Sequence, residues 1–355
     1  MFEKVYVHEL KWKNITLPIY YDKEYIDSEL RQANLALNFL LQKIKEGSIK
    51  ISEKNKKIEL ANDCINSSYI EGYQTSYVGD MLVDDIKAVP YKRAEKATLC
   101  AYRAYQGVFE EGIELSSIEN IIKVWRKLVK YHIFMYKTIR IEPVIVGNIH
   151  GIVHKGPPMQ YVRQLLEDML EWERGFEKVS DDEFCLLKGI IAHYIFVYIH
   201  PFMDGNGRMS RLYEQYLIQK DNSLPVYFDF SGQIYKEHGY YYGSYQTAKE
   251  KDEKGKLKEL NISEFIRFNL YCIKQSIIKM YSEFNIELQK GNILYYESIE
   301  KLLKYRTNIF YFDKKGVIEN IGYEEYVLNL MQGIFIERIY NDVSVHIKMR
   351  ESEYV

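Results

Sequence analysis

The sequence predicts a mainly α-helical protein with one β-hairpin and a small α+β region near its C-terminal end. The segment Cys185–Ile199 is apolar nearly all round, as expected of a buried central helix. Residues 91–280 hold most of the other apolar segments of helical length. The 355 residues include only seven prolines and no proline- or serine-rich linker, so we expect residues 1–280 to pack as one unit.

Composition is that of an ordinary soluble protein. Hydrophobic residues make up 47% of the chain, charged residues 28%, and the net charge is −2. No overall basic charge therefore indicates nucleic-acid binding. The sequence shows no N-terminal signal pattern and no apolar run that approaches a membrane span. The cysteines form no close pairs and lie in apolar contexts, so we expect reduced core residues and a cytoplasmic location; they are Cys64, Cys100, Cys185 and Cys272.

We assign residues 1–90 to an N-terminal region. Val5–Tyr21 is β-like or extended, and Ser28–Lys45 is predicted to be a helix. A further helix is predicted from 58 to 71, where apolar residues recur at helical spacing.

The region 91–280 contains a β-rich stretch, Glu142–Pro158. Gly147-Asn148 and Gly151 interrupt it, which predicts a hairpin. Such a hairpin can cover a binding site or simply cap the helical core. Farther along, the charged stretch Lys249–Lys258 is most simply an exposed surface connection.

Residues 200–211, His-Pro-Phe-Met-Asp-Gly-Asn-Gly-Arg-Met-Ser-Arg, are the most informative segment of the chain. A neutral imidazole such as that of His200 can accept a proton at pH 7. Asp204 offers a carboxylate of the kind that binds Mg2+ while phosphate oxygens complete its coordination. Gly205 and Gly207 can take positive φ at little cost, so successive backbone N–H groups can face an anion.

The residues after these glycines add positive charge. Gly207–Lys220 is predicted to be a new helix whose N-terminal dipole favours an anion in the same pocket. Arg208 and Arg211 lie three residues apart on one helix face, where both can reach phosphate oxygens. A lone Gly-Asn-Gly is usually a turn, and a lone histidine beside an apolar helix usually belongs to the core. The joint pattern instead favours a metal-bound polyphosphate beside a proton acceptor. The sequence has no Gly-x-x-x-x-Gly-Lys-Ser/Thr motif, and no third glycine completes a dinucleotide fingerprint.

At these residues the chain resembles the Fic family, whose signature is His-x-Phe-x-Asp-Gly-Asn-Gly-Arg-x-x-Arg, and every fixed position is met. Fic proteins are mostly adenylyltransferases that move AMP from ATP to a protein hydroxyl. The resemblance covers about 30–275 and implies a Fic-type helical bundle. It makes His200 the base, Asp204 the Mg2+ ligand and Phe202 a buried anchor. It implies a nucleotide site formed by Asp204, Gly205, Asn206, Gly207, Arg208, Met209, Ser210 and Arg211, with residues 205–207 as the anion cradle and the two arginines on the β- and γ-phosphates.

A second segment, Asn66–Gly72, is similar to the family's inhibitory motif, Ser/Thr-x-x-x-Glu-Gly/Asn. Ser67 and Glu71 share one helix face, and Gly72 suits the end of that helix. In the family the glutamate reaches the second motif arginine, here Arg211, and prevents it from orienting the γ-phosphate. Two charges about 4 Å apart interact by about 4 kcal/mol at an effective dielectric constant of ~20, before desolvation is counted. An ordinary acidic helix end is the alternative; beside the twelve-residue motif we favour inhibition within the same chain.

The resemblance also makes the hairpin a flap that covers the nucleotide and pairs with the target backbone. On that analogy the phosphate pocket is lined by Ile152, Val153, His154 and Lys155. Tyr241 and Tyr242 resemble the family's Tyr-Tyr element, whose rings pack near adenine. Where many relatives carry Asn eight residues after the first of these tyrosines, this chain has Lys249. Asn261–Phe268 resembles the helix that closes the Fic core.

Residues 285–355 carry no family signal. We predict helices and then two strands, located at Tyr296–Tyr305, Glu324–Gln332, Ile334–Ile339 and Val343–Met349. Helices followed by a hairpin fit a small winged-helix module, and a packing or dimerisation extension fits equally well. No basic recognition helix decides between them.

The function we favour is an autoinhibited adenylyltransferase that moves AMP from Mg-ATP to Ser, Thr or Tyr hydroxyls of a protein target, itself included. One alternative is a deAMPylase in which Glu71 positions water. Another is a DNA-binding regulator in which the Fic core senses nucleotide and the C-terminal module contacts DNA. Phosphocholine and UMP stay open as transferred groups, and a homodimer stays open as the assembly.

Overall fold

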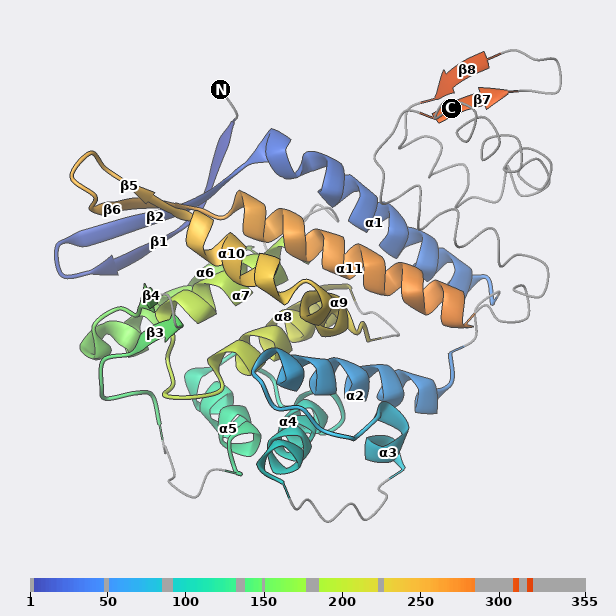
Figure 1. Cartoon of the computed structure of the whole chain (residues 1–355), viewed down its shortest axis with the longest axis horizontal. Coiled ribbons are helices and arrows are strands. Elements are labelled where there is room, and N and C mark those ends of the chain that lie inside the picture. Colours follow the sequence, from blue (N-terminus) through green and yellow to red (C-terminus); the bar gives the residue numbers. More distant parts are fainter. Residues whose placement is uncertain are drawn as a thin grey trace. The chain divides into compact units, whose positions relative to one another are not determined.

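The computed structural model describes residues 3–47, 51–84, 92–131, 138–148, 151–176, 185–222, 227–284, 309–312 and 318–321. They fall into two compact units: Met1–Arg31 with Ile51–Ser276, and Gln32–Lys50 with Ile277–Val355. Helices α1 (Lys23–Lys45) and α11 (Ser263–Phe284) each continue from the first unit into the second. Most of the described residues are helical (Figure 1), which confirms the mainly α fold class.

Helix α7 (Cys185–Ile199) forms the centre of the first unit. Every side chain from Leu186 to Phe196 is buried, which confirms the predicted central helix. Helix α8 (Asn206–Asn222) packs against α7, and α6 (Val162–Phe176) packs on α7 as well. The loop 200–205 joins α7 to α8 and therefore lies between two firmly packed helices.

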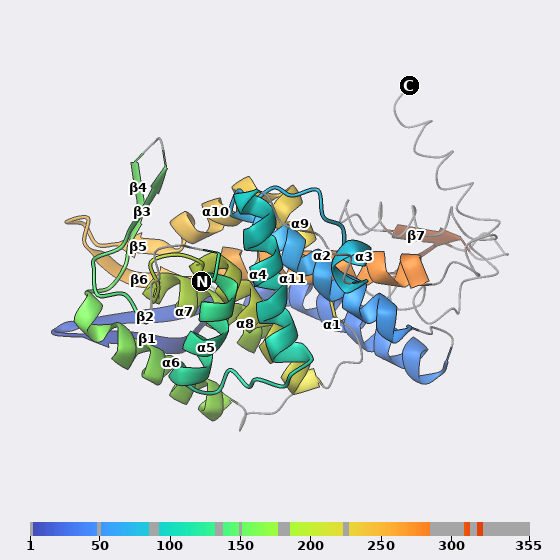
Figure 2. The ribbon, with the colours of Figure 1, turned by 90° about the horizontal axis from the view of Figure 1, so that it is seen from below.

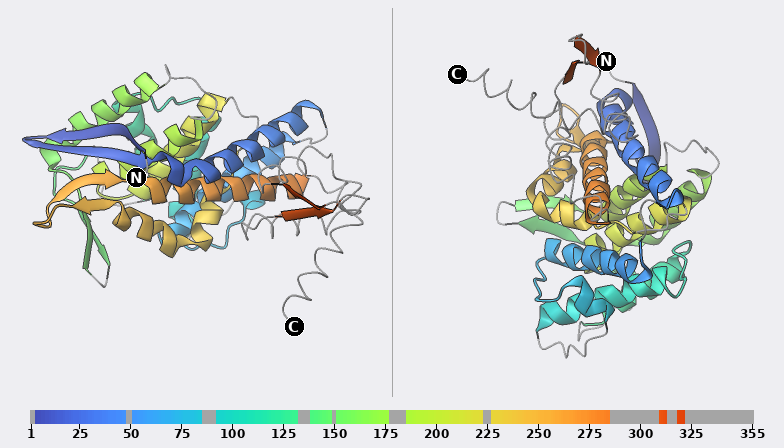
Figure 3. Two further views of the ribbon diagram at one scale, coloured as in Figure 1. Left: turned by 90° about the horizontal axis from the view of Figure 1, so that it is seen from above. Right: turned by 90° about the vertical axis from the view of Figure 1, so that its right-hand side faces the viewer.

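Helix α2 (Glu53–Ile70) lies between α8 and α4 (Arg93–Phe109), as Figures 1 and 3 show. It also contacts α3 (Gly79–Val83) and α9 (Phe230–Lys236). The Ser52 hydroxyl caps its N-terminus by accepting a hydrogen bond from the Asn55 N–H.

The C-terminal end of α2 has the predicted form. Gly72 follows in the left-handed conformation, and its N–H donates to the Tyr69 carbonyl at 2.9 Å. The Tyr73 N–H donates to the Ser68 carbonyl at 3.0 Å. Helix α5 (Ile118–Leu128) packs on α4 and carries Trp125 toward the loop after α7.

Four described strands form a mixed sheet in the order β1-β2-β6-β5. Strands β1 (Lys4–Trp12) and β2 (Ile15–Asp22) pair antiparallel and confirm the extended character of Val5–Tyr21. Strand β6 (Leu257–Asn261) pairs parallel with β2 and antiparallel with β5 (Lys249–Lys251).

The expectation that Lys249–Lys258 is an exposed surface connection holds for the exposed residues 252–256 but was wrong for both ends of the stretch, which are strands. Its charge misled the prediction: an edge strand can carry lysines and still pair through its backbone.

Strands β3 (Ile145–Asn148) and β4 (Gly151–Lys155) form the predicted hairpin, with Ile145 opposite Lys155 and Asn148 opposite Gly151. Figure 2 shows this hairpin projecting beyond the helices. The short 3-10 helix η1 (Met159–Tyr161) leads from it into α6, and α10 (His238–Thr247) carries the paired tyrosines.

The second unit contains an antiparallel hairpin of β7 (Ile309–Phe312) and β8 (Ile318–Ile321), which the sequence did not predict. The helices and strands predicted between 296 and 349 lie outside the described residues, so the winged-helix module stays a prediction. Cys64, Cys100 and Cys272 are buried free thiols, as expected. None of the described helices combines the length and hydropathy that crossing a bilayer requires.

Candidate active site

His200 opens the loop between α7 and α8 with an unusual backbone. Its φ is +52°, a backbone conformation that residues with a Cβ rarely adopt. Nδ1 lies 3.3 Å from the Val197 carbonyl, so it carries the hydrogen and leaves Nε2 as the acceptor. Burial lowers the pKa of His200 to about 4. The imidazole is therefore neutral at pH 7 and can accept a proton.

Contacts within the loop fix its shape. The Phe202 ring stacks on Trp125 with centroids 4.2 Å apart, which confirms Phe202 as a buried anchor. The buried Asn206 side chain accepts from the Phe202 N–H at 2.9 Å and donates to the Phe202 carbonyl at 2.7 Å. These two hydrogen bonds close the loop. They were not expected, because the family resemblance gave Asn206 only a place in the anion cradle.

The two glycines of the motif have different roles. Gly205 has φ +81°, as expected. Gly207 does not use positive φ, because α8 already begins at Asn206; the expectation for that residue was wrong. A Cβ at Gly207 would lie 2.2 Å from Glu71 Oε1, so the absence of a side chain permits the approach of Glu71. Met209 is fully buried, and the Ser210 hydroxyl donates to the Gly207 carbonyl within the first turns of α8.

The Asp204 carboxylate is held from two sides. Oδ1 accepts from the Gly205 N–H at 2.6 Å, and Oδ2 lies 3.0 Å from the Tyr131 hydroxyl. The Trp125 indole N–H donates to the Asp204 carbonyl at 2.9 Å. Among the described residues, no three acidic, histidine or cysteine side chains are grouped so that they could hold a metal ion. One carboxylate suits Mg2+ that is shared with a polyphosphate, since Mg2+ commonly takes few protein ligands in such sites.

Arg208 is fully buried beside Asp204. Its Nη2 donates to the Tyr131 hydroxyl at 2.8 Å, and its guanidinium lies 4.7 Å from the Tyr73 ring centre. Nε and Nη1 are buried and have no hydrogen-bond partner among the described residues. Unpaired guanidinium N–H groups next to a carboxylate fit the oxygens of a Mg-bound phosphate chain.

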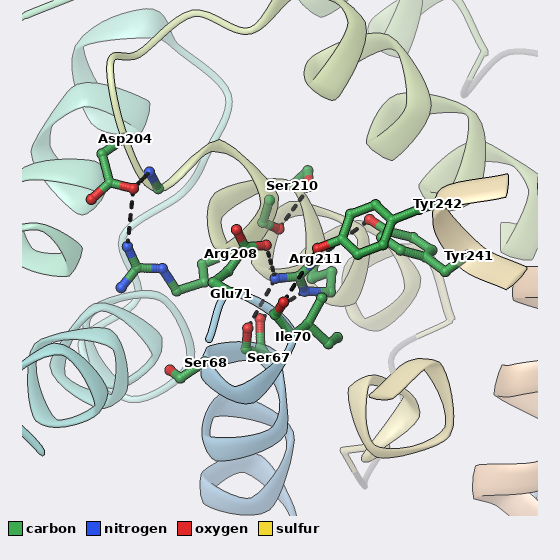
Figure 4. A network of polar contacts seen from close by, with 12 residues as sticks. Ser67, Ser68, Ile70, Glu71, Asp204, Arg208, Ser210, Arg211, Tyr241 and Tyr242 are labelled. Carbon is green, nitrogen blue, oxygen red and sulfur yellow. Dashed lines mark hydrogen bonds and ion pairs between the residues drawn. The ribbon is translucent and has the colours of Figure 1, made fainter. Parts of the chain in front are cut away.

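Arg211 has the opposite environment, shown in Figure 4. Nη2 donates to Glu71 Oε1 at 2.7 Å and to the Ser67 carbonyl at 2.9 Å, while Nε donates to the Ser67 hydroxyl at 2.8 Å. Nη1 lies 3.4 Å from the Tyr241 hydroxyl. Burial is the largest single influence on the pKa of Arg211 and lowers it, but the Glu71 carboxylate, with Tyr241 and Tyr242, raises that pKa above its usual range. The residues predicted to meet from α2 and α8 therefore do meet.

A buried polar chain lies behind Arg211. Tyr241 is buried, and its hydroxyl is 2.9 Å from Nε2 of His193, whose Nδ1 is 2.5 Å from Glu214. Burial raises the pKa of Glu214 to about 8 and lowers that of His193 well below its usual range, so this pair is neutral at pH 7. Tyr242 is more exposed and donates to the Ile70 carbonyl at 3.2 Å.

The hairpin reaches the same region through His154. Its Nε2 is 2.8 Å from the Tyr198 carbonyl, and its ring centre is 6.3 Å from that of His200. Burial lowers the pKa of His154 to about 4. Lys155 is exposed, and the side chains of Ile152 and Val153 lie outside the described part of the chain.

Arg140 is a buried residue that the sequence analysis missed. Its Nε donates to the His200 carbonyl at 2.7 Å, and its Nη1 and Nη2 donate to the carbonyls of Glu142 and Pro157 at 3.1 and 2.5 Å. One guanidinium thus ties both ends of the hairpin segment to the first residue of the loop. Nη2 also donates to the Ile199 carbonyl at 3.3 Å. Nothing in the sequence around Arg140 signals this role, because these partners are all backbone carbonyls.

The profile of the Fic/DOC family matches residues 115–218, a stretch that includes α5, the hairpin, α7 and the entire loop. This chain carries a Fic/DOC-family domain. The resemblance inferred from the twelve-residue motif is thereby confirmed.

Curated relatives agree over part of the chain. The protein adenylyltransferase fic-1 of Caenorhabditis briggsae is 30% identical over 115 residues, which cover 31% of this chain and 20% of that protein. The protein adenylyltransferase Fic of Aedes aegypti is 38% identical over 88 residues, 24% of this chain and 15% of the relative. This chain thus spans a fifth or less of the length of these two relatives.

Solved structures agree over most of the chain. A Fic family protein from Desulfovibrio desulfuricans G20 has a TM-score of 0.60 and 20% identity, covering 73% of this chain and 74% of that one. Fic-1 from C. elegans has a TM-score of 0.54 and 21% identity, covering 76% and 74%. These likenesses confirm a Fic-type helical fold.

Proposed function

We propose that this chain is an autoinhibited protein adenylyltransferase, which transfers AMP from Mg-ATP to Ser, Thr or Tyr hydroxyls of a protein target, including its own. The observation that carries the proposal is the arrangement of the loop. A neutral His200 with Nε2 as acceptor precedes one carboxylate and two buried arginines, and α2 places Glu71 on the second arginine.

In this mechanism His200 Nε2 accepts the proton of the target hydroxyl as the hydroxyl oxygen attacks the α-phosphorus of ATP. The bond from that phosphorus to the bridging oxygen breaks, and pyrophosphate leaves. Asp204 would hold Mg2+, which neutralises phosphate charge when bound. The backbone N–H groups of Asn206 and Gly207 and the guanidiniums of Arg208 and Arg211 would stabilise the charge of the phosphate chain, whereas the Gly205 N–H already donates to Asp204.

Inhibition is assigned to the segment that ends α2. Glu71 and Ser67 occupy the donors of Arg211 that a γ-phosphate would need, and Gly72 ends the helix so that the Glu71 side chain faces α8. Release of this contact is the step that would admit a productive nucleotide.

The remaining nucleotide contacts follow the family pattern. The flap residues Ile152, Val153, His154 and Lys155 would cover the phosphates. Of the paired tyrosines, Tyr242 is the more exposed and is the one we assign to the adenine side. Tyr241 would act through Arg211, which its hydroxyl contacts. A cytoplasmic location, a homodimer and a DNA-binding C-terminal module stay predictions.

A deAMPylase is the second candidate, and one observation favours it. The Glu71 side chain is 28% exposed and contacts Arg211 through Oε1, so its carboxylate also reaches solvent. Such a group can orient water toward a bound AMP ester. Removal of AMP from a modified target by the wild type, lost in Glu71→Gly, would favour hydrolysis over transfer.

The transfer hypothesis is tested by mass spectrometry of intact protein after incubation with ATP and Mg2+. Glu71→Gly is expected to gain the mass of one or more AMP groups, and the double variant with His200→Ala is expected to gain none. A Glu71→Gly protein of unchanged mass that also modifies no added protein would contradict the proposal. A different added mass would identify another transferred group.

A further inference from the structure

The Tyr131 hydroxyl occupies a junction in the active site. It follows α5 by a few residues and lies 3.0 Å from Asp204 Oδ2, 2.8 Å from Arg208 Nη2 and 2.9 Å from the Tyr73 hydroxyl. Its ring also lies beside the Arg208 guanidinium, 5.3 Å from centre to carbon. One hydroxyl therefore contacts both the Asp204 carboxylate in the loop and Arg208 on α8.

Counting protons assigns the direction of each of these bonds. A phenol has one hydrogen and two lone pairs. The ionised Asp204 carboxylate can only accept and the Arg208 guanidinium can only donate. Tyr131 must therefore donate to Asp204 and accept from Arg208, and the Tyr73 hydroxyl supplies the third hydrogen bond as a donor. The Tyr131 hydroxyl is saturated by these three partners.

We propose that Tyr131 is a positioning residue, whose hydroxyl fixes the Asp204 carboxylate and the Arg208 guanidinium for a Mg-bound phosphate chain. This inference rests on the proposed nucleotide site. It assigns Tyr131 no contact with the reacting atoms. The hydroxyl occupies one lone pair of Oδ2, and the Gly205 N–H holds Oδ1 from the other side, so the orientation of the carboxylate is set before a ligand arrives.

The arrangement around Arg208 supports the same role. Tyr131 takes one N–H of Nη2, while Nε and Nη1 stay buried and unpaired within the described part of the chain. Tyr131 thus holds the guanidinium at Nη2, and Nε and Nη1 can donate to a ligand. Preorganisation of this kind lowers the cost of binding, because the ligand does not have to order the side chain.

Tyr131→Phe separates positioning from packing. The phenyl ring keeps its place against Arg208, and only the hydroxyl is lost. Tyr73→Phe is the matched control, because it removes one tyrosine hydroxyl from the same cluster yet leaves the bonds from Tyr131 to Asp204 and Arg208 intact.

The test measures binding of α,β-methylene-ATP by calorimetry in the Glu71→Gly background, with Mg2+ and with EDTA. The gain in affinity that Mg2+ confers is expected to fall roughly tenfold in Tyr131→Phe and to stay within about twofold in Tyr73→Phe. Unfolding temperatures of both variants are expected to stay close to that of the parent.

An unchanged Mg2+ gain in Tyr131→Phe would overturn the inference, and so would an equal loss in Tyr73→Phe, since the effect would then belong to the cluster as a whole. Neither outcome would contradict the proposed function if the Glu71→Gly parent binds α,β-methylene-ATP with Mg2+. A parent that binds no nucleotide would overturn the proposed function itself.

Discussion

Arg208 and Arg211 lie one helical turn apart on α8 and are both fully buried, yet their environments are opposite. Arg211 donates to Glu71, to the carbonyl and hydroxyl of Ser67, and to Tyr241. Arg208 donates to Tyr131, and two of its nitrogens have no partner in the described structure. Helix α2 thus satisfies one arginine, whereas Nε and Nη1 of the other stay unpaired in the described structure.

The difference has an energetic meaning. A buried donor without a partner costs about 1–3 kcal/mol, so the unpaired Nε and Nη1 of Arg208 carry a cost that phosphate oxygens would offset, although Asp204 already lies 3.6 Å from Nη2. The Arg211 environment is favourable as it stands, and a nucleotide must compete with Glu71 for it. Inhibition in this view acts on one phosphate contact and leaves the rest of the site assembled.

The largest expected effect comes from removing the prepared arginine. In the Glu71→Gly background, Arg208→Gln is expected to lower the rate of AMP transfer roughly 100-fold, because two charge-assisted hydrogen bonds to phosphate are lost. Initial rates with α-labelled ATP measure this. A rate within about threefold of the parent would show that Arg208 is not a phosphate ligand.

For folding stability, the substitution of Arg211 is expected to have a larger effect than the substitution of Arg208. Arg211→Met strands the Glu71 carboxylate and the Ser67 carbonyl and is expected to lower the free energy of unfolding by about 2 kcal/mol. Arg208→Met removes two nitrogens that lack partners in the described structure, together with the Nη2 contacts to the Tyr131 hydroxyl and to the part-exposed Asp204 carboxylate. It is expected to cost about 1 kcal/mol, less than Arg211→Met. Denaturant unfolding of both variants compares them, and equal losses would break the contrast.

Ser67→Ala is expected to loosen Arg211 without removing Glu71. Loss of the hydroxyl contact weakens the docked state by about 1 kcal/mol, which predicts transfer about fivefold above wild type. Ser68→Ala is the matched control: this buried neighbour donates to the Cys64 carbonyl and does not contact Arg211. Equal rates in the two variants would mean that Ser67 does not contribute to inhibition.

The smallest expected effect is a pH dependence of folding stability that comes from Glu214, in the hydrogen-bonded series of buried side chains behind Arg211. Folding raises the pKa of Glu214 to about 8, so the folded state keeps a proton that the unfolded chain releases near pH 4.5. Stability from this group is present at acid pH and is lost as pH rises toward 8. The unfolding temperature of wild type minus that of Glu214→Gln is expected to fall by about 2 °C per pH unit between pH 6 and 7.5. A flat difference would contradict the raised pKa.

Contiguous features of the fold and site were predictable from sequence. The twelve-residue motif 200–211 is a single segment, and the helix before it is apolar nearly all round. The partnership of Glu71 with Arg211 joins residues 140 positions apart, and only the family resemblance suggested it.

The residues that support the site were not predictable. Tyr131 is one of 33 tyrosines, and nothing beside it in the sequence distinguishes it. Arg140 binds carbonyls, which every residue carries. Gly207 was expected to turn the chain, but its role depends on the approach of a carboxylate from another helix. Such roles arise from tertiary packing, which local patterns do not encode.

The most direct test of the account compares initial rates of AMP incorporation from α-labelled ATP in wild type, Glu71→Gly and the double variant Glu71→Gly/Arg211→Gln. We predict that Glu71→Gly is at least roughly tenfold faster than wild type, and that the double variant loses this gain because the freed arginine is gone. Equal rates in wild type and Glu71→Gly would contradict the claim that the Glu71–Arg211 contact restrains the enzyme.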